Sequence, residues 1–144
     1  MALLLRESDV ENLLTMPMTL ELIERVHREY STGSAIDVPR ERTRLPKATL
    51  HILQGAVPSA NVLGYKAYTS SREGVRFLVY AFNAERGNLD VVVEANYMGM
   101  MRTGAAQITL FESQGMAMQD LIMAAELARL ARAKGVGSEL DLGK

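Results

Sequence analysis

The stretch Tyr97–Leu121, YMGMMRTGAAQITLFESQGMAMQDL, decides how the fold is interpreted, because it joins a strand-rich segment to a long C-terminal helix. Its first half predicts a helix over Met98–Gln107, followed by a short extended piece at Ile108–Phe111. Ser113 is a candidate cap for a final helix over Gln114–Lys134. Apolar and small side chains nearly encircle this final helix, which predicts that it packs against other elements on two sides.

Two more helices are predicted near the N-terminus. Ser8 is followed three residues later by Glu11, a spacing typical of a capping box, and this predicts a short helix over Asp9–Leu14. Pro17 suits the first turn of a second helix, since a backbone N–H has no partner there in any case. The apolar residues of this helix fall at helical spacing and form one face: Leu22, Ile23, Val26 and Tyr30. The Gly-containing segment Ser31–Ser34 is expected to end that helix.

Strands are predicted between these helices and the C-terminal part. Ile36–Arg44 is an extended basic run, and Pro39 inside it indicates a strand start or a sheet edge, because proline cannot donate to a ladder. Alternating apolar residues predict four more strands, Thr49–Leu53 (ending in a Gly55–Pro58 turn), Val62–Thr69, Val75–Phe82 and Leu89–Ala95. The segment Glu85–Asn88 predicts a hairpin between the last two of these strands. Both alternating sets of Val75–Phe82 are largely apolar, so we expect both its faces to be covered, one by a helix and the other by a second subunit.

These elements predict one α+β domain over residues 1–144, an antiparallel sheet packed by N- and C-terminal helices. With 144 residues, 48% of them hydrophobic, the chain is long enough to bury a core. The 16 Lys and Arg nearly cancel the 17 Asp and Glu, which argues against nucleic acid and anionic membranes as partners. Cysteine is absent, which excludes disulfides and thiol catalysis and fits the cytoplasmic location that we expect. The apolar segment Ala2–Leu5 is too short for a signal peptide or a membrane span.

Three positions carry cations that are candidates for binding an anion. Arg40, with Arg42 and Arg44, points to one side of an extended run; this is either a charged edge strand or a clamp for a carboxylate. Lys66 interrupts an otherwise uncharged strand, so it either extends to the surface or is held inside by an anion. Arg102 is the only charge between Glu94 and Glu112, and its apolar surroundings leave surface and site interpretations equally open.

Other chemistry has little support in the sequence. His51 lies on a predicted strand, where a lone histidine is more often structural than catalytic, and His27 is assigned no role. Two histidines so far apart, without a carboxylate at ligand spacing, predict no metal site. The glycine pattern of a dinucleotide-binding loop is also missing, because Gly135-Val136-Gly137 follows a helix and Leu140 stands where the third glycine would be. The sequence therefore predicts no cofactor site in this chain.

Several motifs in order resemble the ornithine cyclodeaminase/mu-crystallin family, which includes cyclodeaminases, alanine dehydrogenases and ketimine reductases. The resemblance covers nearly the whole chain and rests on Leu3-Leu4-Leu5, Asp9-Val10, Pro39-Arg40, Leu50-His51-Ile52-Leu53, Gly64-Tyr65-Lys66, Met101-Arg102-Thr103-Gly104-Ala105, and Thr109-Leu110-Phe111-Glu112-Ser113-Gln114-Gly115 with Asp120. It implies a substrate-binding and dimerisation domain, a homodimer formed through its sheet, and NAD(H) or NADP(H) as the cofactor of the full-length family.

The resemblance also assigns residues. It implies that Arg40 and Arg102 hold the α-carboxylate of a small amino or imino acid, and that Lys66 lies beside the reacting carbon and helps to move a proton. His51 falls where cyclodeaminases carry a glutamate, so it is a weak catalytic candidate and argues against an ornithine-cyclising role. Phe77 falls near a threonine position of the cyclodeaminases and is a second departure.

In this family the Arg-Thr-Gly-Ala helix leads into a Rossmann domain that binds NAD(P), and a Phe-x-Ser-x-Gly segment returns from it. Here that domain is missing between about Ala105 and Ile108, which divides the chain into an N-terminal segment 1–106 and a returning segment 107–144. The neat junction favours engineered over natural removal. We expect the removal to expose apolar surface around the methionines Met98, Met100, Met101, Met116 and Met118.

Three functions follow from the resemblance. The first is a noncatalytic substrate-binding and dimerisation domain, because the cofactor that carries the hydride would have no site. The second is a residual enzyme of the family (cyclodeaminase, ketimine reductase or amino-acid dehydrogenase) that borrows a cofactor domain in trans or uses Lys66 without cofactor. The third is a structural dimer whose cations have no remaining task.

Overall fold

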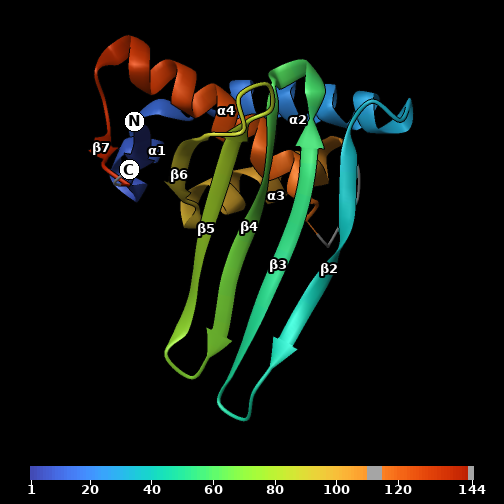
Figure 1. Cartoon of the computed structure of the whole chain (residues 1–144). Coiled ribbons are helices and arrows are strands. Elements are labelled where there is room, and N and C mark those ends of the chain that lie inside the picture. The colour runs from blue at the N-terminus through green and yellow to red at the C-terminus, as the bar shows by residue number, and fades with distance from the viewer. Residues whose placement is uncertain (110–114, 143–144) are drawn as a thin grey trace.

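The fold is a seven-stranded sheet covered on one face by helices, and the computed structural model describes residues 1–109 and 115–142 (Figure 1). The strands lie in the order β2-β3-β4-β5-β6-β1-β7. Their bounds are β1 (Ala2–Leu5), β2 (Ile36–Arg44), β3 (Ala48–Val57), β4 (Val62–Ser71), β5 (Gly74–Asn83), β6 (Leu89–Glu94) and β7 (Ser138–Leu140). The helices are α1 (Glu7–Leu13), α2 (Met16–Ser31), α3 (Asn96–Thr109) and α4 (Ala117–Lys134), with a short 3₁₀ turn at Pro58–Ala60.

The α+β class is confirmed, but the sheet is not wholly antiparallel. β1 pairs with β6 in parallel, while the other described pairings are antiparallel. The sequence did not predict β1 or β7, because four apolar residues and three residues at the chain's end give no measurable periodicity. Both strands form because neighbouring strands pair with them. Leu3 of β1 pairs with Val91 of β6 on one side and with Glu139 of β7 on the other.

The second predicted helix is confirmed and the first begins earlier than predicted. In α2 the Thr15 hydroxyl accepts a hydrogen bond from Met18 N at 3.4 Å and proline lies in the first turn. In α1 the N-cap is Arg6 and not Ser8, because the Asp9 carboxylate accepts from Arg6 N at 3.0 Å. Glu94, far along the chain, accepts from Glu7 N at 3.0 Å and holds the same end of the helix.

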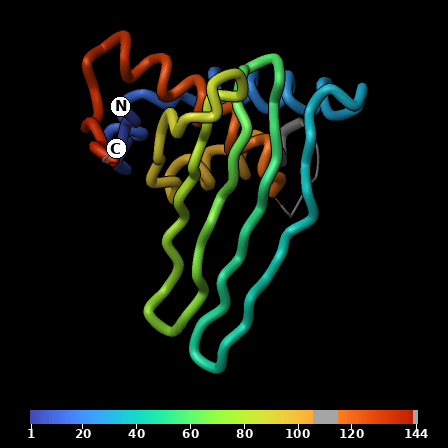
Figure 2. Tube along the Cα trace, in the orientation of Figure 1, coloured from blue at the N-terminus to red at the C-terminus, as the bar shows by residue number. Residues whose placement is uncertain are grey.

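The central strands are longer than predicted. β3 continues through the Gly55–Pro58 segment that was expected to turn, since Gly55 to Val57 pair with β4 and the chain reverses only at the 3₁₀ turn. The predicted hairpin at Glu85–Asn88 is confirmed and joins β5 to β6. β2 lies at the sheet edge, as Pro39 indicated, and its register shifts between Val38 and Glu41. Strands β2 to β5 extend well beyond the helices as two long hairpins (Figures 1 and 2).

Helix α4 lies between the sheet and the other helices, as predicted. It contacts β3 and β4 on one side and α2 on the other, and it ends at Gly135, whose φ is 65°. It begins at Ala117, later than the predicted Gln114, and Met116 is its N-cap. The predicted cap Ser113 lies outside the described residues.

The junction between α3 and α4 differs from its prediction at two described positions. α3 continues through Ile108 and Thr109, which were expected to be extended, because the helical hydrogen-bond pattern persists to that point. Leu110 and Phe111, the rest of the predicted extended piece, lie outside the described residues.

Among residues 1–109 and 115–142, the helices cover only one face of β5. Val79 and Ala81 are buried beneath the helices, whereas Leu78, Tyr80 and Phe82 on the other face are only partly buried. The prediction that both faces of β5 are covered is therefore confirmed for the face that contacts the helices. Cover of the other face by a second subunit stays a prediction. Within residues 1–109 and 115–142, no helix is long and apolar enough to cross a membrane.

The predicted cluster of exposed methionines is wrong for two of its members. Met98 and Met118 are fully buried in the core between the helices and the sheet. Met100 is 62% exposed, and Met101 and Met116 are partly buried against the core. Helical periodicity explains the difference, because Met98 and Met100 lie on opposite sides of α3.

Candidate functional site

A cavity of about 400 Å³ lies where α3 and the start of α4 meet the helix-facing side of the sheet. Three of the predicted site residues line it, each from a different element: Arg40 from β2, Lys66 from β4 and Arg102 from α3. His51 is not among the lining residues. The full lining is Arg40, Leu53, Lys66, Tyr68, Phe77, Asn96, Gly99, Met100, Arg102, Thr103, Gly115 and Asp120.

Lys66 is held inside the protein by an anion. Its Nζ lies 3.3 Å from Oδ1 of Asp120, and its side chain is 5% exposed. The ammonium also lies 4.6 Å from the centre of the Phe77 ring. Burial lowers the pKa of Lys66, Asp120 opposes that shift, and the nearby Arg102 and Arg40 add to it. The surface interpretation of Lys66 is therefore wrong.

Asp120 is the buried carboxylate at the centre of the site, and the sequence reasoning did not select it as a site residue. Its side chain is 1% exposed, and Oδ1 is 3.3 Å from Arg102 Nε as well as from Lys66 Nζ. Its other oxygen, Oδ2, is buried without a hydrogen-bond partner among the described residues. A signal was present, because Asp120 is the only charge between Glu112 and Glu126 in the sequence.

Arg102 is fixed by α4 and not displayed on the surface. Its side chain is 12% exposed, and Nη1 donates to the Gln119 side-chain oxygen at 3.0 Å. That oxygen also accepts from Met116 N at 3.1 Å, and the Gln119 amide nitrogen lies 2.7 Å from Nε2 of His27. The guanidinium packs so closely on Gly115 that a Cβ there would overlap it.

Arg40 reaches the cavity from the irregular part of the edge strand. Its Nε is buried and lacks a hydrogen-bond partner in the part of the chain that the structure describes. Arg42 and Arg44, further along β2, are exposed. The edge-strand interpretation of this basic run is confirmed, because β2 lies at the edge of the sheet. The carboxylate clamp stays a prediction, and of the three arginines Arg40 alone lines the cavity.

His51 lies beside the cavity on the protruding part of β3. Its Nε2 is 3.0 Å from the Ser70 hydroxyl, and its ring stacks on Tyr68 with centroids 4.4 Å apart. Burial lowers the pKa of His51, and the positive charges of Arg42, Arg40 and Arg44 lower it further.

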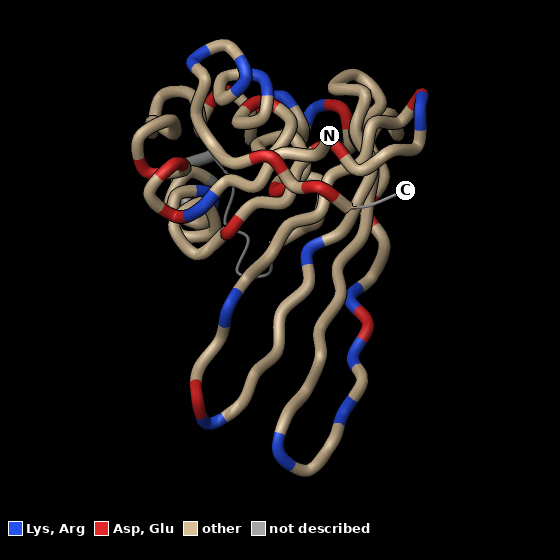
Figure 3. Tube along the Cα trace, turned by 60° about the vertical axis from the view of Figure 1, so that its left-hand side comes forward, with Lys and Arg blue, Asp and Glu red and all other residues tan. Residues whose placement is uncertain are grey.

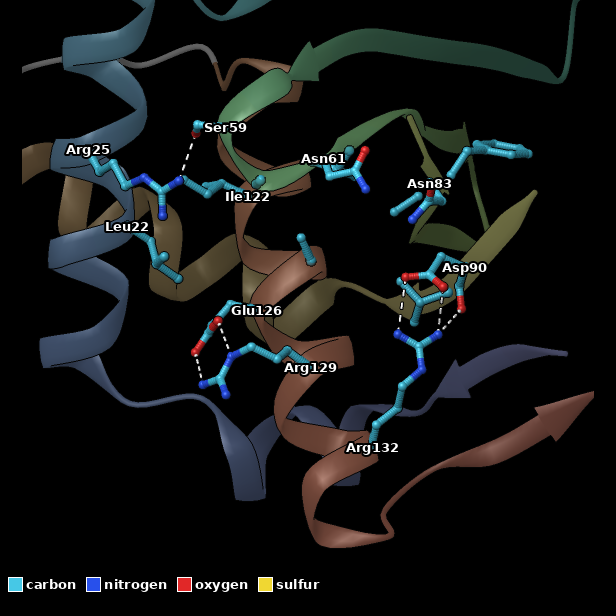
Figure 4. A pocket seen from close by; sticks show the side chains of 16 residues that line it. Leu22, Arg25, Ser59, Asn61, Asn83, Asp90, Ile122, Glu126, Arg129 and Arg132 are labelled. Carbon is cyan, nitrogen blue, oxygen red and sulfur yellow. Dashed lines mark hydrogen bonds and ion pairs between the residues drawn. The ribbon is translucent and has the colours of Figure 1, made fainter. Parts of the chain in front are cut away.

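A second cavity, of about 430 Å³, lies beside α2 and α4, at the starts of β4 and β6 and the end of β5 (Figure 4). Its charged side chains are already paired. Arg132 contacts Asp90 at 2.7 Å, Arg129 contacts Glu126 at 2.6 Å, and Arg25 contacts Glu29 at 3.0 Å. Because its cations are neutralised, the cavity at Lys66 is the better candidate site. In the described ranges, no group of His, Cys, Asp and Glu could hold a metal ion.

The lowered pKa of Lys66 predicts how stability depends on pH. Between that lowered pKa and the ordinary value of 10.5, the unfolded chain holds a proton that the folded chain has lost, so the free energy of unfolding rises with pH. We expect the wild type to gain stability over Lys66→Met as the pH is raised towards 10.5. Urea unfolding of both chains at several pH values measures this difference, and a difference that falls with rising pH would show that Asp120 dominates.

Three solved structures illustrate the proteins that this fold resembles. A probable ornithine cyclodeaminase from Bordetella pertussis Tohama I has a TM-score of 0.72 at 24% identity, over 75% of this chain and 35% of that one. An iminosuccinate reductase of Paracoccus denitrificans in complex with NAD⁺ has a TM-score of 0.70 at 25% identity, over 74% of this chain and 36% of that one. An archaeal alanine dehydrogenase dimer with bound NAD has a TM-score of 0.69 at 19% identity, over 97% of this chain and 56% of that one.

The fold thus defines a class whose solved members include NAD-bound dehydrogenases and reductases of amino and imino acids. In particular, it is the fold of the ornithine cyclodeaminase/mu-crystallin family, and the resemblance carried by the motifs is confirmed at the level of the fold. The chain spans between 35% and 56% of the length of these three proteins. No family model matches the sequence, and no curated protein does.

Proposed function

We propose that this chain is a substrate-binding and dimerisation domain that binds the carboxylate of a small amino or imino acid without turning it over. The observation that carries the proposal is the convergence of Arg40, Lys66 and Arg102, from three separate elements, on one cavity. Guanidinium groups grip a carboxylate through paired hydrogen bonds, and Arg40 Nε is buried without a partner among the described residues.

The absence of turnover follows from the missing hydride carrier. Two of the similar structures hold NAD, and this chain spans only part of their length. We infer that the dinucleotide-binding domain is the part missing between about Ala105 and Ile108. NAD(P) supplies the hydride when bound, and the protein around it orients the substrate. Within this chain Lys66, with its lowered pKa, remains a vestigial group for moving a proton at the bound acid.

Calorimetric titration with small amino and imino acids tests the proposal. We expect Arg40→Gln to weaken binding about tenfold, or ~1.4 kcal/mol, since it removes a charged donor from the cavity. Arg86→Gln, on the exposed turn between β5 and β6, is the matched control and should bind as the wild type does. Equal loss in both variants would contradict a specific site.

The wild-type chain and its variants also distinguish two alternative functions. Turnover with added NADH, abolished by Lys66→Ala, would show that the chain is still an enzyme. A chain that binds no acid and does not respond to Arg40→Gln would be a structural scaffold.

We also propose that two copies pair through the face of the sheet opposite the helices. Tyr65 and Tyr80 stack on this face with ring centroids 4.8 Å apart, and Tyr65 lies 6.2 Å from Phe82. Leu63 beside them is 41% exposed in the single chain. A contiguous apolar and aromatic face of this kind is typical of an interface.

Sedimentation velocity tests this pairing. We expect the wild type to sediment as a dimer and Leu63→Arg as a monomer, because the substitution buries an unpaired charge in the interface. Tyr30→Arg, on an exposed part of α2, is the control and should remain dimeric. A monomeric wild type, or a dimeric Leu63→Arg, would overturn the proposed interface.

A further inference from the structure

The cavity at Lys66 carries more positive than negative charge. Arg40, Lys66 and Arg102 line it, and Asp120 is the only carboxylate among its lining residues. The charge of Asp120 is already engaged, because Oδ1 lies 3.3 Å from both Lys66 and Arg102. A ligand with one carboxylate would therefore leave positive charge uncompensated at the site.

The positive surface continues outward from the cavity along the helix-facing side of the protruding hairpins. Arg42 lies directly opposite His51, and His51 lies opposite Tyr68, which lines the cavity. Residues paired across strands share a face of the sheet, so these side chains form one row. Lys66 precedes Tyr68 by two residues on β4, which places the row about 7 Å from Lys66. Figure 3 shows basic residues along these hairpins.

Buried polar atoms without a hydrogen-bond partner within the described part of the chain gather here: Arg40 Nε, Arg102 Nε and Asp120 Oδ2 at the cavity, and His51 Nδ1 on the row beside it. Unsatisfied buried groups are uncommon and call for an explanation such as a bound ligand. The pKa of His51 is lowered by burial and by Arg42, Arg40 and Arg44. An anion placed against this row would offset the positive charge that lowers it.

We infer that the site takes an amino or imino acid with a second carboxylate on its side chain. The α-carboxylate lies among Arg40, Lys66 and Arg102, and the distal carboxylate lies between Arg42 and His51. This inference rests on the proposed function and adds the class of ligand to it. A diamino acid is disfavoured, because its distal cation would lie against Arg42, and the one carboxylate among the residues that line the cavity, Asp120, already faces Lys66 and Arg102.

Calorimetric titration of the 144-residue chain with L-aspartate, L-glutamate, L-alanine and L-ornithine tests the inference. We expect a dicarboxylic acid to bind at least about tenfold more tightly than alanine, and ornithine to bind most weakly. Arg42→Gln should remove this tenfold preference and leave alanine binding unchanged. Arg86→Gln, which makes the same change in net charge on a distant exposed turn, is the matched control and should keep the preference.

The outcomes separate this inference from the proposed function. If alanine and the dicarboxylic acids bind equally well, the dicarboxylate inference is wrong and the proposed function stands. Equal losses in Arg42→Gln and Arg86→Gln would mean a general electrostatic effect and would also overturn the inference. If no acid binds at all, both proposals fail. His51→Gln gives a second measurement, and it too should weaken the binding of the dicarboxylic acids and leave alanine binding unchanged.

Discussion

Replacing Asp120 by alanine is expected to lower the free energy of unfolding by about 3–5 kcal/mol, the largest effect we expect from a single substitution in the site. The carboxylate is 1% exposed and serves both Lys66 and Arg102, whose side chains are 5% and 12% exposed. Removing it leaves two buried cations facing each other without a counter-charge. Urea unfolding at one fixed protein concentration measures the loss.

Two further variants test whether the loss comes from the buried charge. Asp120→Asn keeps the shape of the side chain and should lose most of the same stability, since the charge is what pairs the cations. Glu126→Gln breaks an exposed ion pair with Arg129 and should have little effect, because solvent screens such pairs. Similar losses in Asp120→Ala and Glu126→Gln would contradict the central role of Asp120.

Gly64→Ala is expected to destabilise the protein by about 3 kcal/mol, near the upper end of the usual effect of overpacking. A Cβ at Gly64 would overlap the backbone oxygen of Tyr80 on the neighbouring strand, and it would lie 3.0 Å from Cδ2 of Leu121. Leu121 belongs to α4 and is fully buried, so neither neighbour has room to move away. Thermal or urea unfolding measures the change.

Gly104→Ala is the matched control for this substitution. Gly104 lies within α3, and the nearest atom to a Cβ there is Cε of Met16 at 3.6 Å, an ordinary contact. Alanine is the better helix former, so this variant should be more stable by about 0.5–1 kcal/mol. If both variants change stability in the same direction, the close approach of β5 and α4 to Gly64 is not what requires glycine at this position.

Much of the fold could be predicted where local chemistry and hydrophobic period agree. Pro17, the glycine after α2 and the apolar face of the helix predicted α2, and the Glu85–Asn88 turn predicted the β5–β6 hairpin. The edge position of β2 followed from Pro39, because its missing N–H excludes a central strand. The α1 cap was predicted at the wrong residue, because the Asp9 carboxylate caps Arg6 N and Glu94, far along the chain, holds the same end of the helix.

The candidate site was predicted only in part. Arg40, Lys66 and Arg102 were selected because each is a cation in an unusual place, and the structure brings all three to one cavity. Asp120 was not selected, because its importance depends on a contact across 54 positions of sequence. The neighbours Gln119 and His27 of Arg102 were missed for the same reason.

The sequence by itself determined the α+β class, the four central strands, α2 and the C-terminal helix, because periodicity, turn residues and helix ends act over a few neighbouring residues. Only the tertiary structure decided the parallel pairing of β1, the burial of Met98 and Met118, and whether Lys66 lies inside or at the surface. These features depend on which distant segments meet: Lys66 is held in the interior because the buried carboxylate of Asp120 lies beside it.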